Sequence, residues 1–145
     1  MRYFAAPLAA FALVGTLAGT PVEAVAEGQA AASVGCYSAG CNDKDPQTMG
    51  CGADAVTGAR TTMPDGAVVE LRWSDACQAA WGRISGARAD QFVSVNGPNS
   101  QSHSAWIDAP GQTSGWTTMV MDRSIVDTAY ACGNNGIVMH CTVAY

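Results

Sequence analysis

The segment AVVELRWSDACQAAWGRI, residues 67–84, gives the clearest indication of the fold. In its first half the apolar residues Val69, Leu71 and Trp73 alternate with charged ones, which is the period of a strand with one buried face. Polar turn-forming residues follow Trp73. We therefore expect residues 78–84 to run back beside the first strand as a hairpin partner, with a short helix there as the alternative.

Further short apolar runs recur along the rest of the chain, separated by clusters of Gly, Pro and Asn. Regularly spaced short strands with such turns predict an all-β domain, a small sandwich or barrel of six or seven strands. The segment 36–51 is instead rich in turn-forming residues and predicts an irregular, cysteine-rich N-terminal loop. The expected later strands cover residues 91–95, 103–107, 116–121, 127–132 and 137–143.

Residues 1–26 have the pattern of a secretory signal peptide. Arg2 precedes an uncharged apolar run, and the small residues before Glu27 suit signal peptidase, so cleavage is expected after Ala26. The apolar run is too short for a permanent membrane span. We expect a secreted chain without stable membrane insertion, with a flexible start over 27–35 and one domain over 36–145.

The charge of the chain argues against nucleic acid as a partner. Lys and Arg number 7 against 12 Asp and Glu, for a formal net charge of -5. A protein that binds a phosphate backbone needs clustered cations, whereas these are scattered among acidic neighbours.

All six cysteines lie beyond the predicted cleavage site. An even number in an exported chain predicts a disulfide framework. Zinc is the alternative, but no Cys-x-x-Cys pair occurs, so no metal or other cofactor is expected. Because six cysteines allow many connectivities, we choose by proximity, which pairs Cys36 with Cys41, Cys51 with Cys77, and Cys132 with Cys141.

Two groups of polar residues could support catalysis or metal binding, and each has a simpler structural explanation. His103 and His140, with Asp108 or Asp122 and a serine, could form a hydrolytic triad, since a triad is defined by geometry. No nucleophile elbow or zinc-protease motif accompanies them, so no catalytic residue is assigned.

The acidic cluster Asn42, Asp43 and Asp45 resembles the start of a calcium loop. It lacks the later Gly and Glu of an EF-hand, which favours turn and capping roles.

Two of the four tryptophans are candidates for ligand binding. Trp73 and Trp81 fit buried positions, whereas Trp106 alternates with polar residues and Trp116 adjoins a Gly-rich turn. An exposed indole can stack on a sugar or a peptide. We therefore expect Trp106 and Trp116 to be exposed and treat them as the ligand-binding candidates.

The cysteines, together with several short motifs, resemble the domain-of-unknown-function family numbered 2690. The resemblance spans nearly all of residues 36–141 and implies an extracytoplasmic bacterial domain, secreted or membrane-tethered, common in actinobacteria. It implies no activity and no site residues. The residues that carry it are Cys36-Tyr37, Cys41, Lys44-Asp45-Pro46, Cys51, Asp54-Ala55, Val69 to Ser74, Cys77 and Ala80-Trp81.

These observations favour a secreted or envelope-associated binding domain without enzymatic activity, whose ligand belongs to the cell envelope or the extracellular space. Two alternatives stay open. One is a secreted hydrolase, which a deep pocket holding His103 or His140 with a carboxylate would support. The other is a proteinase inhibitor that presents a disulfide-braced loop, with 119–123 or 132–141 as the candidate segments.

Overall fold

The hairpin expected from residues 67–84 is the centre of the structure. The computed structural model describes residues 33–123 and 127–145, so the predicted signal peptide lies outside the described residues. Strand β2 (Val68–Ser74) pairs antiparallel with β3 (Ala79–Ser85), which places Arg72 opposite Trp81 and Glu70 opposite Arg83. The alternative of a short helix is therefore wrong.

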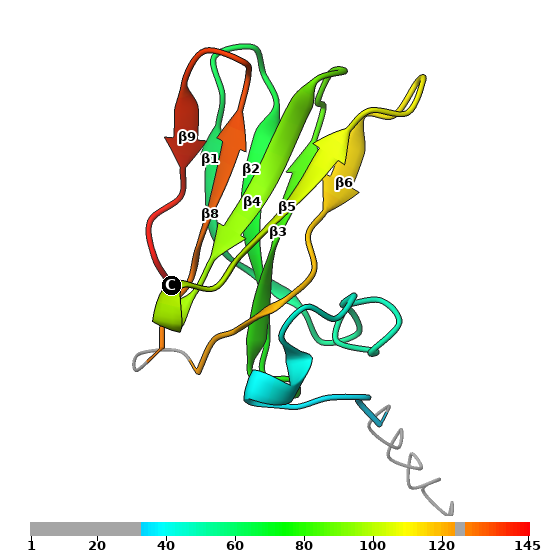
Figure 1. Ribbon diagram of the computed structural model, residues 1–145, viewed down its shortest axis with the longest axis vertical. Helices are drawn as coiled ribbons and strands as arrows, with labels where there is room; N and C mark the ends of the chain where they lie inside the picture. Colours follow the sequence, from blue (N-terminus) through cyan, green and yellow to red (C-terminus); the bar gives the residue numbers. More distant parts are fainter. Residues whose placement is uncertain (1–32, 124–126) are drawn as a thin grey trace, which may run out of the picture. The chain divides into compact units, whose positions relative to one another are not determined.

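The described residues form two antiparallel sheets, and they form no α-helix. Sheet A has the order β1-β2-β3-β6, with β7 also paired to β3, and sheet B has the order β5-β4-β8-β9. The two sheets lie face to face (Figure 1), so the fold is a sandwich and not a closed barrel. The other strands are β1 (Val56–Thr62), β4 (Gln91–Asn96), β5 (Ser102–Ile107), β6 (Ser114–Trp116), β7 (Val120–Met121), β8 (Tyr130–Asn134) and β9 (Met139–Cys141).

The main core lies between the sheets. Val69 and Leu71 of β2 are fully buried, as their alternation predicts, and they pack with side chains of both sheets. Trp73 is half-buried, and its indole Nε1 donates a hydrogen bond to the carbonyl oxygen of Asp122 at 3.1 Å. The other buried members of this core include Met63, Ile84, Val93, Val95, Ile107, Val120 and Ala131.

A second core lies on the outer face of sheet A. There the irregular N-terminal segment, residues 34–55, covers β3 and buries Trp81 to 2% exposure. The segment contains one 3-10 turn, η1 (Ser38–Cys41), and lies near the start of β3 in Figure 1. A second 3-10 turn, η2 (Pro98–Ser100), joins β4 to β5.

The continuous strand expected over 116–121 is instead two short strands, β6 and β7. Between them, Thr117 N–H donates to the Gly82 carbonyl oxygen at 2.9 Å, and Met119 N–H donates to the Lys44 carbonyl oxygen at 2.9 Å. The backbone there bonds partly to the N-terminal segment, which interrupts its pairing with β3.

Among the described residues, no helix has the length and apolar character needed to cross a membrane.

Candidate functional site

Trp106 and Trp116 are both exposed, but they lie on opposite faces of the sandwich. Trp106 of β5 is 56% exposed and Trp116 of β6 is 44% exposed. Their chain neighbours Ile107 and Gly115 are buried toward the core, so by strand alternation each indole points outward from its own sheet. The structure therefore does not bring the two candidates together.

Trp106 belongs to an uncharged outer face of sheet B. It packs against Phe92 of β4, with ring centroids 4.7 Å apart. Register places Asn134 beside Phe92, and Met139 beside Asn134, in the same cross-strand row. The two rings are inclined at 45° to each other, so this face presents a tilted aromatic pair.

Trp116 lines a surface pocket of about 400 Å³ on the outer face of sheet A. The pocket opens where the N-terminal segment stops covering the sheet. Strand register explains the grouping, because Trp116 is paired with Arg83 and Arg72 is paired with Trp81. The lining residues are Gln47, Gly52, Ala55, Arg72, Trp81, Arg83, Ser114 and Trp116.

Two guanidinium groups line this pocket. Arg72 donates to Thr57 Oγ1 at 2.5 Å and to the Ala55 carbonyl oxygen at 2.9 Å, which fixes its head group. Arg83 is half exposed, and its Nη1 lies 3.7 Å from Glu70 Oε2. A guanidinium carries several N–H donors, so both groups retain donors for a ligand.

Trp116 is held in place by Asp45 of the N-terminal segment. Its indole Nε1 donates to Asp45 Oδ2 at 3.0 Å, while Asp45 Oδ1 accepts the backbone N–H groups of Gln47 at 2.8 Å and Thr48 at 2.9 Å. Burial acts to raise the pKa of Asp45, but the hydrogen bonds from Thr48, Trp116 and Gln47 outweigh it, so this pKa lies below its ordinary value. The carboxylate is thus ionised at neutral pH and orients the indole.

A second pocket, of about 350 Å³, adjoins the first, since Ser114 and Trp116 line both. Trp116, Ser114 and Asp45 line it together with Ala105, Gly115 and Gln112. Trp116 therefore forms a wall shared by two adjoining pockets.

The two histidines lie at opposite edges of sheet B, His103 on β5 and His140 on β9. His103 Nδ1 is 3.6 Å from Asp43 Oδ1, which also accepts a hydrogen bond from Thr118 Oγ1 at 3.3 Å. The carboxylate thus stands between the hydroxyl and the imidazole, which is not the order of a hydrolytic triad. Neither histidine lines either pocket.

The acidic cluster at the start of the N-terminal segment uses its oxygens within the fold. Asn42 Oδ1 accepts the Met121 N–H at 2.7 Å, and Asp45 makes the capping bonds described above. Asn42, Asp43 and Asp45 thus each accept a hydrogen bond from the segment 116–121, which they hold against the N-terminal segment.

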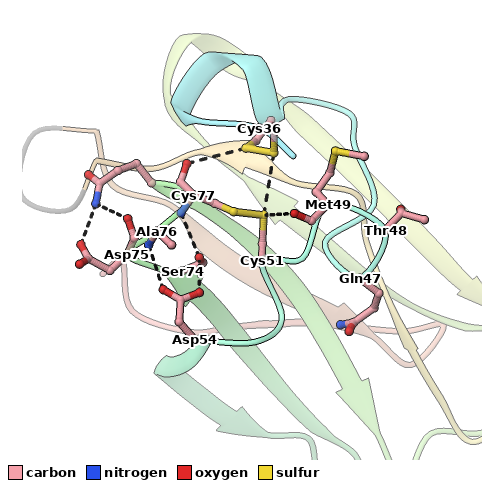
Figure 2. Close-up of a disulfide and its surroundings, with 12 residues drawn as sticks. Cys36, Gln47, Thr48, Met49, Cys51, Asp54, Ser74, Asp75, Ala76 and Cys77 are labelled. Carbon is pink, nitrogen blue, oxygen red and sulfur yellow. Dashed lines mark hydrogen bonds between the residues drawn. A yellow bond between two sulfur atoms is a disulfide. The ribbon is translucent and has the colours of Figure 1, made fainter. Parts of the chain in front are cut away.

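The structure contains three disulfide bonds, joining Cys36 to Cys41, Cys51 to Cys77 and Cys132 to Cys141. These are the pairs chosen from proximity. Figure 2 shows the first two side by side, with Cys51 Sγ lying 3.8 Å from Cys36 Sγ of the other bond. The third bond joins β8 to β9 across their hairpin.

Of the residues in the larger pocket, sequence reasoning identified only Trp116 as a ligand candidate. Arg72 and Arg83 alternate with apolar residues and therefore look like the solvent side of their strands. The neighbouring positions of Arg72 and Trp81 could have been predicted from the hairpin, since a turn after Ser74 pairs these two residues. The pairing of Arg83 with Trp116 depends on β6, which no local pattern specifies.

Fold and site together define a disulfide-stapled β-sandwich domain with an Arg- and Trp-lined surface pocket. Residues 39–132 match the family model described as Protein of unknown function (DUF2690), so the chain belongs to this family. This match confirms the resemblance noted from the sequence. No curated protein and no solved structure matches the chain.

Proposed function

We propose that this chain is a secreted or envelope-associated binding domain without enzymatic activity, and that its ligand is an acidic saccharide bearing carboxylate groups. The observation that carries the proposal is the convergence of Arg72, Arg83 and Trp116 on one pocket of about 400 Å³. Three disulfides suit an oxidising compartment, in keeping with the export signal expected in the sequence.

Each part of the pocket matches a part of such a ligand. Guanidinium groups bind carboxylates through paired, charge-assisted hydrogen bonds. The exposed indole of Trp116 offers a flat apolar surface to a sugar ring. Ser114 and Gln47 supply hydroxyl and amide groups for the sugar hydroxyls.

Charge complementarity supports an anionic ligand. The chain as a whole carries a formal charge of -5, whereas the described residues that line this pocket include two arginines and no carboxylate. Glu70, paired with Arg83, and Asp45, bonded to the Trp116 indole, lie beside them and partly offset this charge. The lining of the pocket itself is therefore cationic on an acidic protein, and acidic surroundings oppose nonspecific binding of polyanions.

The same lining argues for binding and against catalysis. Hydrolysis needs a group that accepts and returns a proton near neutral pH. The described residues that line the larger pocket include no Asp, Glu or His to act as a base for Ser114. Asp45, which lines the second pocket with Ser114, is engaged by the Trp116 indole and two backbone N–H groups. Arginine stays protonated and cannot supply this function.

For the inhibitor alternative, the two candidate segments differ. In 119–123 the residues Met119 to Asp122 are buried, so this segment cannot be presented to a protease. The tip of the β8–β9 hairpin is exposed, with Ile137 at 87%. An inhibitor that binds a protease through this hairpin would not require the Arg- and Trp-lined pocket, so the pocket favours the binding proposal over the inhibitor alternative.

The test is titration calorimetry of the oxidised chain with a soluble uronic acid polymer and with a neutral polymer of the same length. We expect binding of the acidic polymer only. Arg83→Ala and Trp116→Ala should each weaken it by about tenfold or more, the equivalent of one lost charge-assisted or stacking contact.

Matched controls separate the pocket from general effects of charge and aromaticity. Arg88→Ala removes one cation paired with Asp65 away from the pocket, and Trp106→Ala removes the exposed indole of sheet B. Both should leave affinity unchanged. Equal binding of the neutral polymer, or loss on Trp106→Ala instead of Trp116→Ala, would refute the proposal.

A further inference from the structure

Four cysteine sulfurs from separate parts of the chain meet on the outer face of sheet A. The Sγ atoms of Cys36, Cys41, Cys51 and Cys77 all lie within 4.8 Å of one another. They belong to two disulfide bonds, and Figure 2 shows that these bonds are in contact through Cys36 and Cys51. The third disulfide, Cys132–Cys141, is not part of this group.

Opening both disulfides would bring this group to the size of a tetrahedral thiolate site, because the two bonded pairs, now 2.06 Å and 2.03 Å apart, would separate while the unbonded pair need not move. In a zinc centre with four cysteine ligands each Zn–S distance is about 2.3 Å, which sets the sulfurs about 3.8 Å apart. The unbonded separation of Cys36 Sγ and Cys51 Sγ is 3.8 Å. We propose that the four cysteines are a latent metal site that, once both bonds are reduced, binds one Zn²⁺ through four thiolates.

Hydrogen bonds hold the backbone around Cys77 independently of the disulfide. Asp54 Oδ1 accepts from Ser74 Oγ at 2.6 Å, and its Oδ2 accepts from the Ala76 N–H at 2.9 Å. Ser74 Oγ in turn accepts the Cys77 N–H at 3.1 Å, as Figure 2 shows. The turn that carries Cys77 is thus tied to the loop that follows Cys51.

The other ligands are held in a similar way. Ser38 N–H donates to the Cys77 carbonyl oxygen at 2.7 Å, which brings the Cys36–Cys41 loop against the end of β2. Cys51 N–H donates to the Pro46 carbonyl oxygen at 2.9 Å. None of these hydrogen bonds involves a cysteine side chain. The proposal requires that they persist when the sulfur bonds are opened, which would preorganise the reduced site for the metal.

Burial matches a structural metal site rather than a catalytic one. Cys41, Cys51 and Cys77 are fully buried beside Trp81 and Met119, whereas Cys36 is half-buried. Structural zinc sites are closed and have four protein ligands. The side at Cys36 is the route by which a reductant and then a metal ion would enter.

The reaction balances with a trialkylphosphine as reductant. For each disulfide, one phosphine and one water give one phosphine oxide and two thiols, so phosphorus is oxidised and the sulfur–sulfur bond receives two electrons. The four thiols then release four protons as they form four bonds to Zn²⁺. Metal binding therefore replaces two covalent links with one coordinated centre.

The test uses the oxidised chain, reduced anaerobically with a trialkylphosphine and given one equivalent of Zn²⁺ or Co²⁺. We expect one metal ion retained per chain after desalting, and the visible absorption of tetrahedral cobalt thiolate. Alkylation should label Cys132 and Cys141 while the four cluster cysteines are protected. Zinc should also raise the unfolding temperature of the reduced chain, since it binds the folded state.

Two variants sharpen this test. Cys132→Ser with Cys141→Ser removes the distant bridge and should keep the metal. Cys36→Ser removes one ligand and should weaken binding by more than the roughly 10- to 100-fold typical of a lost supporting residue. Alkylation mapping of the unaltered chain tests whether the four cysteines bind the metal, even where a serine variant does not fold. No retained metal, an octahedral cobalt spectrum, or unprotected cluster cysteines would overturn the proposal.

Discussion

At the scale of single residues, two glycines allow the sheets to approach closely. A Cβ added to Gly133 of β8 would lie 2.5 Å from Val69 Cγ2 and 3.0 Å from Met63 Sδ. A Cβ added to Gly82 of β3 would lie 2.8 Å from Val93 Cγ2. Since valine side chains are stiff, these neighbours fill the space in front of each glycine and cannot easily withdraw.

We therefore predict that Gly133→Ala destabilises the domain by about 1 to 3 kcal/mol through overpacking. Urea unfolding of the oxidised chain measures this cost. Gly40→Ala is the matched control, because its added methyl group would meet nothing within 4 Å. Equal costs at the two positions would show that the sheets do not close over Gly133.

Asp45, which accepts the hydrogen bond from the Trp116 indole, should make the stability of the domain sensitive to acid. Its lowered pKa means that the folded chain holds the proton less tightly than the unfolded chain. The stabilisation is therefore complete above the ordinary value of 3.8 and is lost as pH falls through the lower folded value. Solvent screening keeps this contribution modest, since Asp45 is only partly buried.

Comparison of the oxidised chain with Asp45→Asn checks this prediction. The difference in unfolding free energy should be largest near neutral pH and should shrink below about pH 3.8. The subtraction is needed because Asp65, whose pKa is lowered chiefly by its hydrogen bond from Arg88, responds in the same direction. A difference that grows on acidification would contradict the role given to Asp45.

At the scale of elements, the N-terminal segment depends on side chains and disulfides more than on strand pairing. Cys51–Cys77 spans 26 positions in sequence, against 5 for Cys36–Cys41 and 9 for Cys132–Cys141. In the chain-entropy model a longer closed loop gives greater stabilisation. The bridge between the segment and sheet A should therefore matter most.

Replacing each pair by alanine should cost about 3.5 kcal/mol for Cys51–Cys77 and about 2 to 2.5 kcal/mol for each of the other two. Urea unfolding of the three double variants gives the order. A smaller loss for Cys51–Cys77 than for Cys36–Cys41 would mean that the segment is held without its long bridge.

The strands that carry a strong local pattern could be predicted, and those that depend on neighbours could not. Strands β2 and β3 follow from alternation and a polar turn. Strand β1 is absent from the expected strands because it is an edge strand in which only Ala59 is buried, so no apolar alternation marks it. The break between β6 and β7 arises where the Met119 N–H bonds to the carbonyl oxygen of Lys44, a residue distant in sequence, and not to β3.

The candidate site shows the same division. The exposure of Trp116 could be predicted from its own neighbours, as could the disulfide pairs from their spacing. The grouping of Trp116 with Arg83 requires the register of β6, and the meeting of four cysteines requires the N-terminal segment to fold onto sheet A. Both depend on tertiary contacts that a local pattern does not contain.

At the scale of the whole domain, the two outer faces differ in chemistry. The outer face of sheet B presents the uncharged row of Trp106, Phe92, Asn134 and Met139. The outer face of sheet A is divided between the buried cysteine cluster and the cationic pocket of Arg72, Arg83 and Trp116. The outer face of sheet A therefore combines two of the three disulfide bonds with the proposed binding site.

Binding at Trp116 can be followed by NMR through the four tryptophan indole N–H signals during titration with an acidic oligosaccharide. We expect a saturable shift of the Trp116 signal, whose N–H is bonded to Asp45, while the Trp106 signal stays unchanged. A shift of Trp106 alone, or no saturable shift at Trp116, would contradict the proposed function.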